Sequence, residues 1–231
     1  MKKTMTGLLL LPIAAMLLAG CTSGVTSTGN EGASAATATT MTAQTADSGS
    51  SATDTASQEA ATQTADDPEA IIADIDIADY GRITVALDPA AAPLTVENFV
   101  SLAESGFYDG LTFHRIMEGF MMQGGDPDGN GSGGSGKNIK GEFSSNGVDN
   151  PLSHTRGAIS MARAKAPDSA SSQFFIVHED STFLDGDYAA FGYVTEGMDI
   201  VDRVCQDAEP VDNNGTILPE NQPVITAITI R

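Results

Sequence analysis

The side chains that build a hydrophobic core are confined to two parts of this chain, a run near the N-terminus and the region beyond residue 70. Residues 22–69 contain no aromatic residue, and Val25 is their only branched aliphatic residue. A segment of mainly Ala, Thr, Ser and Gly buries too little apolar surface to offset its chain entropy, so we expect it to be disordered. The roughly 160 residues of 70–231 are enough for one ordinary core. We therefore predict a linker over 21–69 and a single folded domain over 70–231.

The N-terminus has the pattern of an export signal. The basic pair Lys2-Lys3 precedes an apolar run over 5–18 that is too short to span a bilayer comfortably. The sequence Leu18-Ala19-Gly20-Cys21 resembles a bacterial lipobox, which implies removal of residues 1–20 and a diacylglyceryl group on the Cys21 thiol. Acyl chains such as palmitate would then anchor the protein to the bacterial cell membrane, on its extracytoplasmic side. An ordinary secretory signal and a retained membrane helix are the alternatives.

Acidic residues outnumber basic ones in the expected linker and in the expected domain. The 31 Asp and Glu residues and 11 Lys and Arg residues give a formal net charge of −20. Seven of the acids lie in 22–69, and Lys2-Lys3 belong to the export signal, so 24 acids and nine bases remain in 70–231. This excess of acids argues against nucleic acid as a partner. It also repels an anionic membrane surface, which is a reason for a covalent anchor.

Short apolar runs with a period of two predict a mainly β domain. An alternating pattern over 71–77 and 82–87, interrupted by Tyr80-Gly81, predicts a hairpin. Further strands are expected near 111–116, 120–123, 158–161, 173–177, 190–194 and 224–230, and helices over 93–105 and 198–205. Eight short strands with two helices favour a closed antiparallel barrel.

One run of this domain combines a cation and an amide with aromatic and thioether side chains. It reads Phe113-His114-Arg115-Ile116-Met117-Glu118-Gly119-Phe120-Met121-Met122-Gln123-Gly124-Gly125-Asp126. Strand alternation places Phe113, Arg115 and Met117 on one face. An arginine among apolar side chains is dry enough to make a strong, directed hydrogen bond.

This run resembles the signature of the cyclophilins, a family of peptidyl-prolyl cis-trans isomerases. Two further segments, 160–176 with Ser171-Ser172-Gln173-Phe174-Phe175-Ile176 and 183–192 with Phe183-Leu184-Asp185-Gly186, follow in the family's order. The resemblance covers about 70–231. It implies a closed eight-stranded antiparallel barrel with a helix capping each end, and rotamase activity without metal or cofactor.

The reaction that the resemblance implies needs no covalent chemistry. Rotation about the amide that precedes proline has a barrier of roughly 18–20 kcal/mol, which comes from its double-bond character. In the twisted state the proline nitrogen regains a lone pair, and a cationic donor binds that state better than either planar state. Arg115, at the position of the family's catalytic arginine, is therefore the expected catalytic residue. A structural ion pair is the alternative role for this side chain.

The resemblance also implies which residues bind the substrate. An apolar cup for the proline ring is expected from Phe120, Met121, Phe175 and Leu184, for which plain core packing is the alternative. Gln123 would bind the peptide backbone or orient Arg115. Backbone groups of Ala162, Arg163 and Ala164 would pair with the peptide, as in strand addition, and Gln173 would contact it. His114 is expected to border the groove as a structural histidine, and Phe183 and Tyr188 complete the expected substrate site.

Phe183 and Tyr188 depart from the best-known eukaryotic members, which often have Trp and His at these positions. The Trp helps to bind cyclosporin in the family, and Phe183 lacks its indole N–H donor. We therefore expect weakened cyclosporin inhibition with isomerase activity retained, and nanomolar inhibition of the wild-type protein would contradict this expectation.

Three other motifs predict no separate site. Residues 131–138 nearly match a phosphate-binding loop, but Asn138 replaces the Ser or Thr that binds magnesium. The run 126–131 resembles the start of an EF-hand loop, but Lys137 stands where that loop needs Glu. The histidines at 114, 154 and 178 lack metal-ligand spacing. Of the two cysteines, Cys21 would be lipidated and Cys205 would be a buried structural thiol, so we expect no disulfide.

Three functions fit these observations to different degrees. The first is an isomerase that acts on proline-containing, unfolded or flexible polypeptides and assists the folding of exported proteins. The second is a non-catalytic peptide-binding or holdase lipoprotein, which the sequence separates from the first only by Arg115 and Gln123. The third is a solute-binding lipoprotein of a transporter, which would need two lobes and a longer chain. We expect the first, acting as a monomer.

Overall fold

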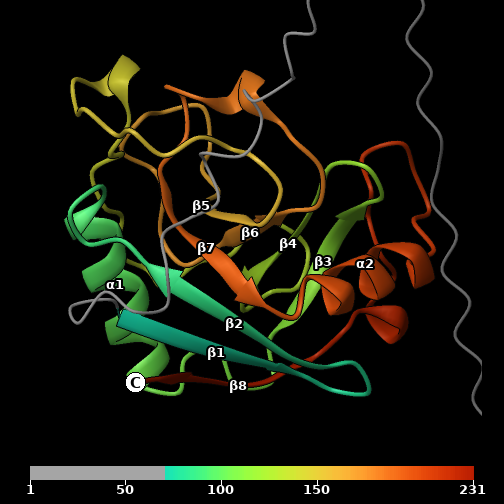
Figure 1. The fold of residues 1–231 in the computed structure, drawn as a ribbon. Helices are drawn as coiled ribbons and strands as arrows, with labels where there is room; N and C mark the ends of the chain where they lie inside the picture. The colour runs from blue at the N-terminus through green and yellow to red at the C-terminus, as the bar shows by residue number, and fades with distance from the viewer. Residues whose placement is uncertain (1–70) are drawn as a thin grey trace, which may run out of the picture. The chain divides into compact units, whose positions relative to one another are not determined.

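The computed structural model describes residues 71–231, which form a curled β-sheet with two α-helices. The strands are β1 (Ile71–Ile77), β2 (Gly81–Leu87), β3 (Thr112–Met117), β4 (Met121–Asp126), β5 (Ala158–Met161), β6 (Phe174–Val177), β7 (Ala190–Glu196) and β8 (Ile225–Ile230). The helices are α1 (Pro93–Glu104) and α2 (Met198–Asp207), and Figure 1 shows them at opposite ends of the sheet. The expected elements are thus present, with ends shifted by a few residues. The export signal, Cys21 and the linker lie outside the described residues.

All neighbouring strands pair antiparallel, in the order β3-β4-β6-β5-β7-β2-β1-β8. The predicted closure into a full barrel is not confirmed, because no ladder joins β8 to β3. An isolated bridge between Thr112 and Val224 links the two ends of the sheet. Beyond it, the outer edge of β3 pairs with the segment after α2: the amide of Ile116 donates to the Gly215 carbonyl at 2.8 Å, and that of Ile217 donates to the His114 carbonyl at 3.0 Å. This segment occupies the edge that a β8 ladder would need, and the sheet is an open half-barrel.

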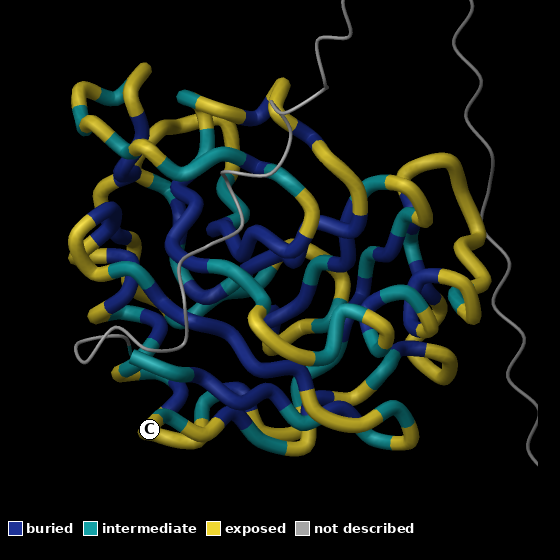
Figure 2. Tube along the Cα trace, in the orientation of Figure 1, coloured by how far each residue is buried: buried dark blue, intermediate teal, exposed yellow. Residues whose placement is uncertain are grey.

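Aromatic rings fill the inside of the curled sheet. Phe174 makes edge-on contacts with Phe99, Tyr108 and Phe113, with ring centroids 5.4, 5.5 and 6.0 Å apart. All four side chains are fully buried. Figure 2 shows buried backbone along the strands and exposed backbone in the connecting loops. Such interlocked rings dominate the stability of a core of this size.

Helix α1 begins at Pro93, which suits a first turn that needs no amide donor. Its preceding residue offers no capping side chain. The buried carboxylate of Glu142 takes that role, because it accepts the amides of Leu94 at 3.1 Å and Thr95 at 2.8 Å. A carboxylate at this position also complements the positive end of the helix dipole.

Helix α2 packs an apolar stripe against the sheet. Val201, Val204 and Cys205 are its buried residues. Cys205 is buried, as predicted, and burial raises the pKa of its thiol to about 12. Within 71–231, no helix has the length and apolarity that a membrane span requires.

Candidate active site

The β3–β4 hairpin positions Arg115 next to Gln123, its partner in the antiparallel register. Contacts to an amide oxygen, a backbone carbonyl and two thioether sulfurs orient the guanidinium. Its Nη1 donates to Gln123 Oε1 at 3.2 Å, its Nε donates to the Asn214 carbonyl at 2.7 Å, and its Nη2 lies 3.3 Å from Met117 Sδ. None of the ion pairs among the described residues involves Arg115. A charged group held by neutral acceptors remains free to interact with a ligand, and the alternative of a structural ion pair finds no support.

Burial lowers the pKa of Arg115 from its ordinary value, while Tyr188 and Asp212 oppose this shift. The side chain stays cationic nonetheless, since arginine is not deprotonated in proteins. Partial burial therefore strengthens the hydrogen bonds of this cation without removing its charge.

A small cavity opens beside this guanidinium. Its volume is about 140 Å³, and it is lined by Arg115, Phe120, Met121, Gln123, Ala162, Arg163, Phe175, Leu184 and Tyr188. Met121, Phe175 and Leu184 form a buried apolar cluster that is separate from the main core. The cavity therefore joins an apolar floor to a cationic rim.

A second cavity of about 410 Å³ shares Gln123, Ala162 and Arg163 with the first. The rest of its lining comes from glycines of the 131–136 loop, from Ala164 and from polar residues, which are Ser132, Asn138, Ser169, Ser171 and Gln173. Two amides cross it in series: Gln123 Nε2 donates to Gln173 Oε1, and Gln173 Nε2 donates to the Gly133 carbonyl, both at 2.8 Å. The two cavities adjoin at the residues that they share, and together they form one groove.

The loop that resembles a phosphate or calcium motif is organised by its own carboxylate. Asp126 accepts the amides of Asp128, Asn130 and Gly131 at 2.9, 3.1 and 2.6 Å. Burial alone would raise the pKa of Asp126, but these hydrogen bonds outweigh burial and lower it. The oxygens of Asp126 thus hold the loop. Among the described residues, no group of three His, Cys, Asp or Glu side chains is arranged to bind a metal.

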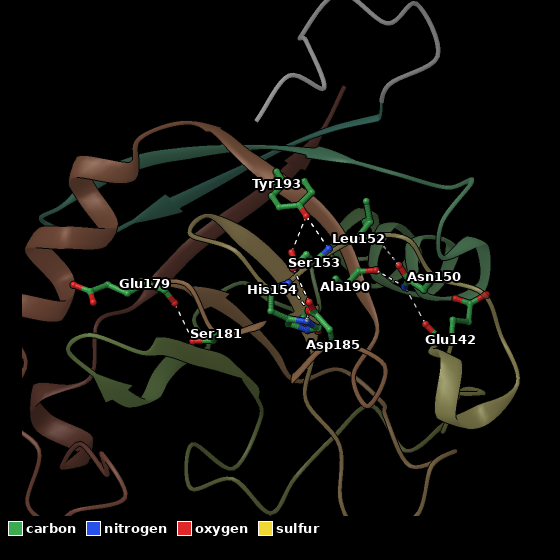
Figure 3. A network of polar contacts seen from close by, with 11 residues as sticks. Glu142, Asn150, Leu152, Ser153, His154, Glu179, Ser181, Asp185, Ala190 and Tyr193 are labelled. Carbon is green, nitrogen blue, oxygen red and sulfur yellow. Dashed lines mark hydrogen bonds and ion pairs between the residues drawn. The ribbon is translucent and has the colours of Figure 1, made fainter. Parts of the chain in front are cut away.

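A polar network includes His154 and Asp185 (Figure 3). His154 Nδ1 lies 2.8 Å from Asp185 Oδ1, and His154 Nε2 lies 2.9 Å from Ser160 Oγ. This order of Ser, His and Asp resembles a hydrolase triad. However, Ser160 and His154 are both 0% exposed, so no substrate reaches the hydroxyl. The network supports the cavity floor instead, because the His154 ring stacks on Phe175 at 5.9 Å.

The comparisons with known proteins agree with this geometry. The family described as "Cyclophilin type peptidyl-prolyl cis-trans isomerase/CLD" matches residues 72–230. The chain belongs to the cyclophilin family. Peptidyl-prolyl cis-trans isomerase B of Bacillus subtilis is 46% identical over 142 residues, which cover 62% of this chain and 90% of that relative. An isomerase of Helicobacter pylori is 46% identical over 128 residues, covering 54% and 76% of the two chains.

A solved cyclophilin of Cryptosporidium parvum, crystallised in the presence of the dipeptide Ala-Pro, has a similar fold. Its TM-score is 0.61 at 30% sequence identity, and the match covers 69% of this chain and 98% of that chain. The likeness therefore concerns the whole of that chain.

The structure brings most of the expected cyclophilin site residues together, but His114 and Phe183 line neither cavity. His114 lines neither cavity; it is 4% exposed, and neither of its ring nitrogens has a hydrogen-bond partner among the described residues. Phe183 is 72% exposed and lies at the rim, where its ring is 5.6 Å from that of Phe120. The remaining expected residues line one cavity or the other.

Two backbone groups that we expected to bind peptide are already used within the cyclophilin domain. The amide of Ala162 donates to the Gln173 carbonyl at 3.0 Å. The carbonyl of Ala164 accepts from Arg163 Nη1, also at 3.0 Å, and the Arg163 guanidinium lies over the Tyr188 ring at 4.7 Å. Arg163 therefore contributes a rigid side chain between the two cavities.

The pH dependence of stability should report the buried histidines of this cyclophilin. Burial lowers the pKa of His154 and of His114 below the unfolded value of 6.5. At a pH below 6.5 the unfolded state binds more protons than the folded state, so the unfolding free energy falls as the pH falls. We therefore expect the protein to be less stable at pH 5.5 than at pH 6.5. Urea unfolding at both pH values should show this loss in the wild type and a smaller loss in His154→Gln; equal losses in the two proteins would contradict the assignment.

Proposed function

We propose that the groove binds an extended, proline-containing polypeptide and that Arg115 accelerates rotation about the bond before proline. The isomerase class itself follows from membership of the cyclophilin family. The observation that carries the mechanism is a guanidinium that lies at the rim of an apolar cavity and forms no ion pair with any carboxylate of residues 71–231.

The proline ring enters the small cavity, where Met121, Phe175 and Leu184 replace its contacts with water. As the bond twists, the proline nitrogen becomes pyramidal, and Arg115 donates a hydrogen bond to its lone pair. This bond forms only in the twisted state, so it lowers the barrier rather than deepening the binding of the planar states. No bond is broken, and the peptide leaves in either isomer.

The larger cavity holds the residues of the bound peptide that adjoin its proline on one side, either the N-terminal or the C-terminal side. Its glycine loop and the amides of Gln123 and Gln173 offer donors and acceptors to a peptide backbone. Because such contacts are independent of side-chain identity, the protein acts on many unfolded or flexible polypeptides. The groove is lined by a single chain, so we propose that the protein works as a monomer.

We further propose that the domain works outside the bacterial membrane, attached to it by lipid on Cys21. Lys2-Lys3, the apolar run over 5–18 and the lipobox-like Leu18-Ala19-Gly20-Cys21 support this proposal. Exported polypeptides that fold slowly because of proline isomerisation are the substrates in this setting. Membrane fractionation and mass spectrometry of wild type and Cys21→Ser test the anchor: wild-type protein without an acyl mass increment would refute it.

The activity is tested with a proline-peptide isomerisation assay on the purified full chain and its Arg115→Ala variant. Catalysis by the wild type and its loss in the variant support the mechanism. Peptide binding by both proteins without catalysis by either would instead indicate a non-catalytic binding module.

A further inference from the structure

The turn at residues 212–216 is folded around the carboxylate of Asp212. Asp212 Oδ1 accepts the amides of Asn214 at 2.9 Å and Thr216 at 3.0 Å, and Oδ2 accepts the Thr216 hydroxyl at 2.9 Å. The Gly215 amide donates to the Asp212 carbonyl at 3.2 Å. These hydrogen bonds, led by that of the Thr216 amide, lower the pKa of Asp212, so the carboxylate is ionised at neutral pH.

This turn is seated directly on β3. The amide of Ile116 donates to the Gly215 carbonyl at 2.8 Å. Gly215 has φ 84°, and a Cβ there would lie 2.6 Å from the Ile116 carbonyl oxygen and 2.5 Å from Met117 Cγ. Only glycine fits both the backbone conformation and the approach. The position of the turn relative to the strand is therefore set closely.

Seated in this way, the turn presents the Asn214 carbonyl to Arg115. The Nε–H of Arg115 donates to it at 2.7 Å, the shortest of the contacts that hold this guanidinium. Gln123 holds Nη1 on the other side. Two acceptors on different edges fix the plane of the guanidinium, which a long arginine side chain would otherwise sample freely.

We propose that Asp212 is a positioning residue for the isomerase: its carboxylate folds the turn whose Asn214 carbonyl aims Arg115 at the proline nitrogen. This inference rests on the proposed role of Arg115. The negative charge of Asp212 also favours the cationic form of Arg115. Charge and geometry thus act on the same group.

A purely structural role for Asp212 predicts that any loss of activity on its replacement follows a loss of stability. Asp, Asn and Gly are common in turns, and Asp212 is exposed. Replacing an exposed turn residue changes global stability little. A loss of turnover without a loss of stability therefore separates the positioning role from a structural one.

The test compares Asp212→Ala, Asp212→Asn and, as a matched control, Asp149→Ala in the full chain. Asp149 is exposed and lines neither cavity. We expect Asp212→Ala to lower kcat/KM about tenfold, mainly through kcat, since misplacing a catalytic group by ~1 Å costs up to ~100-fold. Asp212→Asn keeps one oxygen acceptor for the turn and should recover to within about threefold of wild type. Asp149→Ala should match wild type.

NMR of the Arg115 side chain gives a readout that does not depend on turnover. Solvent exchange of the Arg115 Nε–H should be faster in Asp212→Ala than in wild type, with the melting temperature unchanged. The proposal would be overturned if Asp212→Ala showed the same exchange rate and the same kcat/KM as wild type. It would also be overturned if Asp212→Ala and Asp212→Asn lost kcat/KM equally and in proportion to a fall in their melting temperatures. If the wild type is inactive, the proposed function fails, while the exchange measurement still decides whether Asp212 positions Arg115.

Discussion

Arg115→Ala is expected to lower kcat/KM for a proline peptide by about 100-fold or more. A preorganised donor to a developing lone pair or charge contributes on the order of 10²–10³ in rate. The hydrogen bond proposed here exists only in the twisted state, so peptide affinity should change much less than turnover. Isomerisation kinetics give the rate, and titration calorimetry with the same peptide gives the affinity.

Arg115→Lys is the matched variant for this prediction. Lysine keeps the charge but lacks the Nε–H and the planar fork, so it loses the contact with the Asn214 carbonyl. We expect an activity between those of wild type and Arg115→Ala. Both variants should unfold near the wild-type temperature, because Arg115 takes part in no ion pair among the described residues. Equal kcat/KM in wild type and Arg115→Ala would eliminate the mechanism.

Phe174→Ala is expected to reduce the unfolding free energy by about 3–5 kcal/mol. The ring is fully buried and contacts three other buried rings edge-on, so its removal leaves a cavity that the surrounding strands cannot fill by small shifts. Chemical denaturation with the midpoint and slope fitted together measures the change.

Phe183→Ala removes the same number of atoms from a side chain that is 72% exposed. Its effect on the unfolding free energy should stay within about 0.5 kcal/mol. A similar loss in both variants would show that burial does not decide the effect.

Much of the fold is predictable because the pattern of apolar residues is local. The strand Ile71–Ile77 and the helix Met198–Asp207 follow from periods of two and of 3.6 residues. Closure of the barrel depends instead on which segment takes the outer edge of β3. The segment that pairs with this edge follows α2 and contains Gly215. Its polar turn residues predict a loop from the sequence and do not predict pairing with a strand.

Part of the candidate site is likewise predictable from local sequence, and part is visible only in the folded chain. Arg115 and Gln123 lie side by side because a hairpin register is fixed by a short turn. The network of His154, Ser160 and Asp185 joins residues with no recognisable spacing, and only the folded chain brings them together. The acceptor for Arg115 Nε is a backbone carbonyl, which every residue has, so no sequence pattern could identify it.

The capping of α1 by Glu142 has a consequence for the order of events during biosynthesis. The acceptor for the Leu94 and Thr95 amides lies 48 and 47 positions further along the chain. A nascent polypeptide leaving the ribosome therefore exposes this helix before its cap exists. The first turn gains its partner only after the glycine loop has also emerged, so the start of this helix waits for a residue that lies near the middle of the domain.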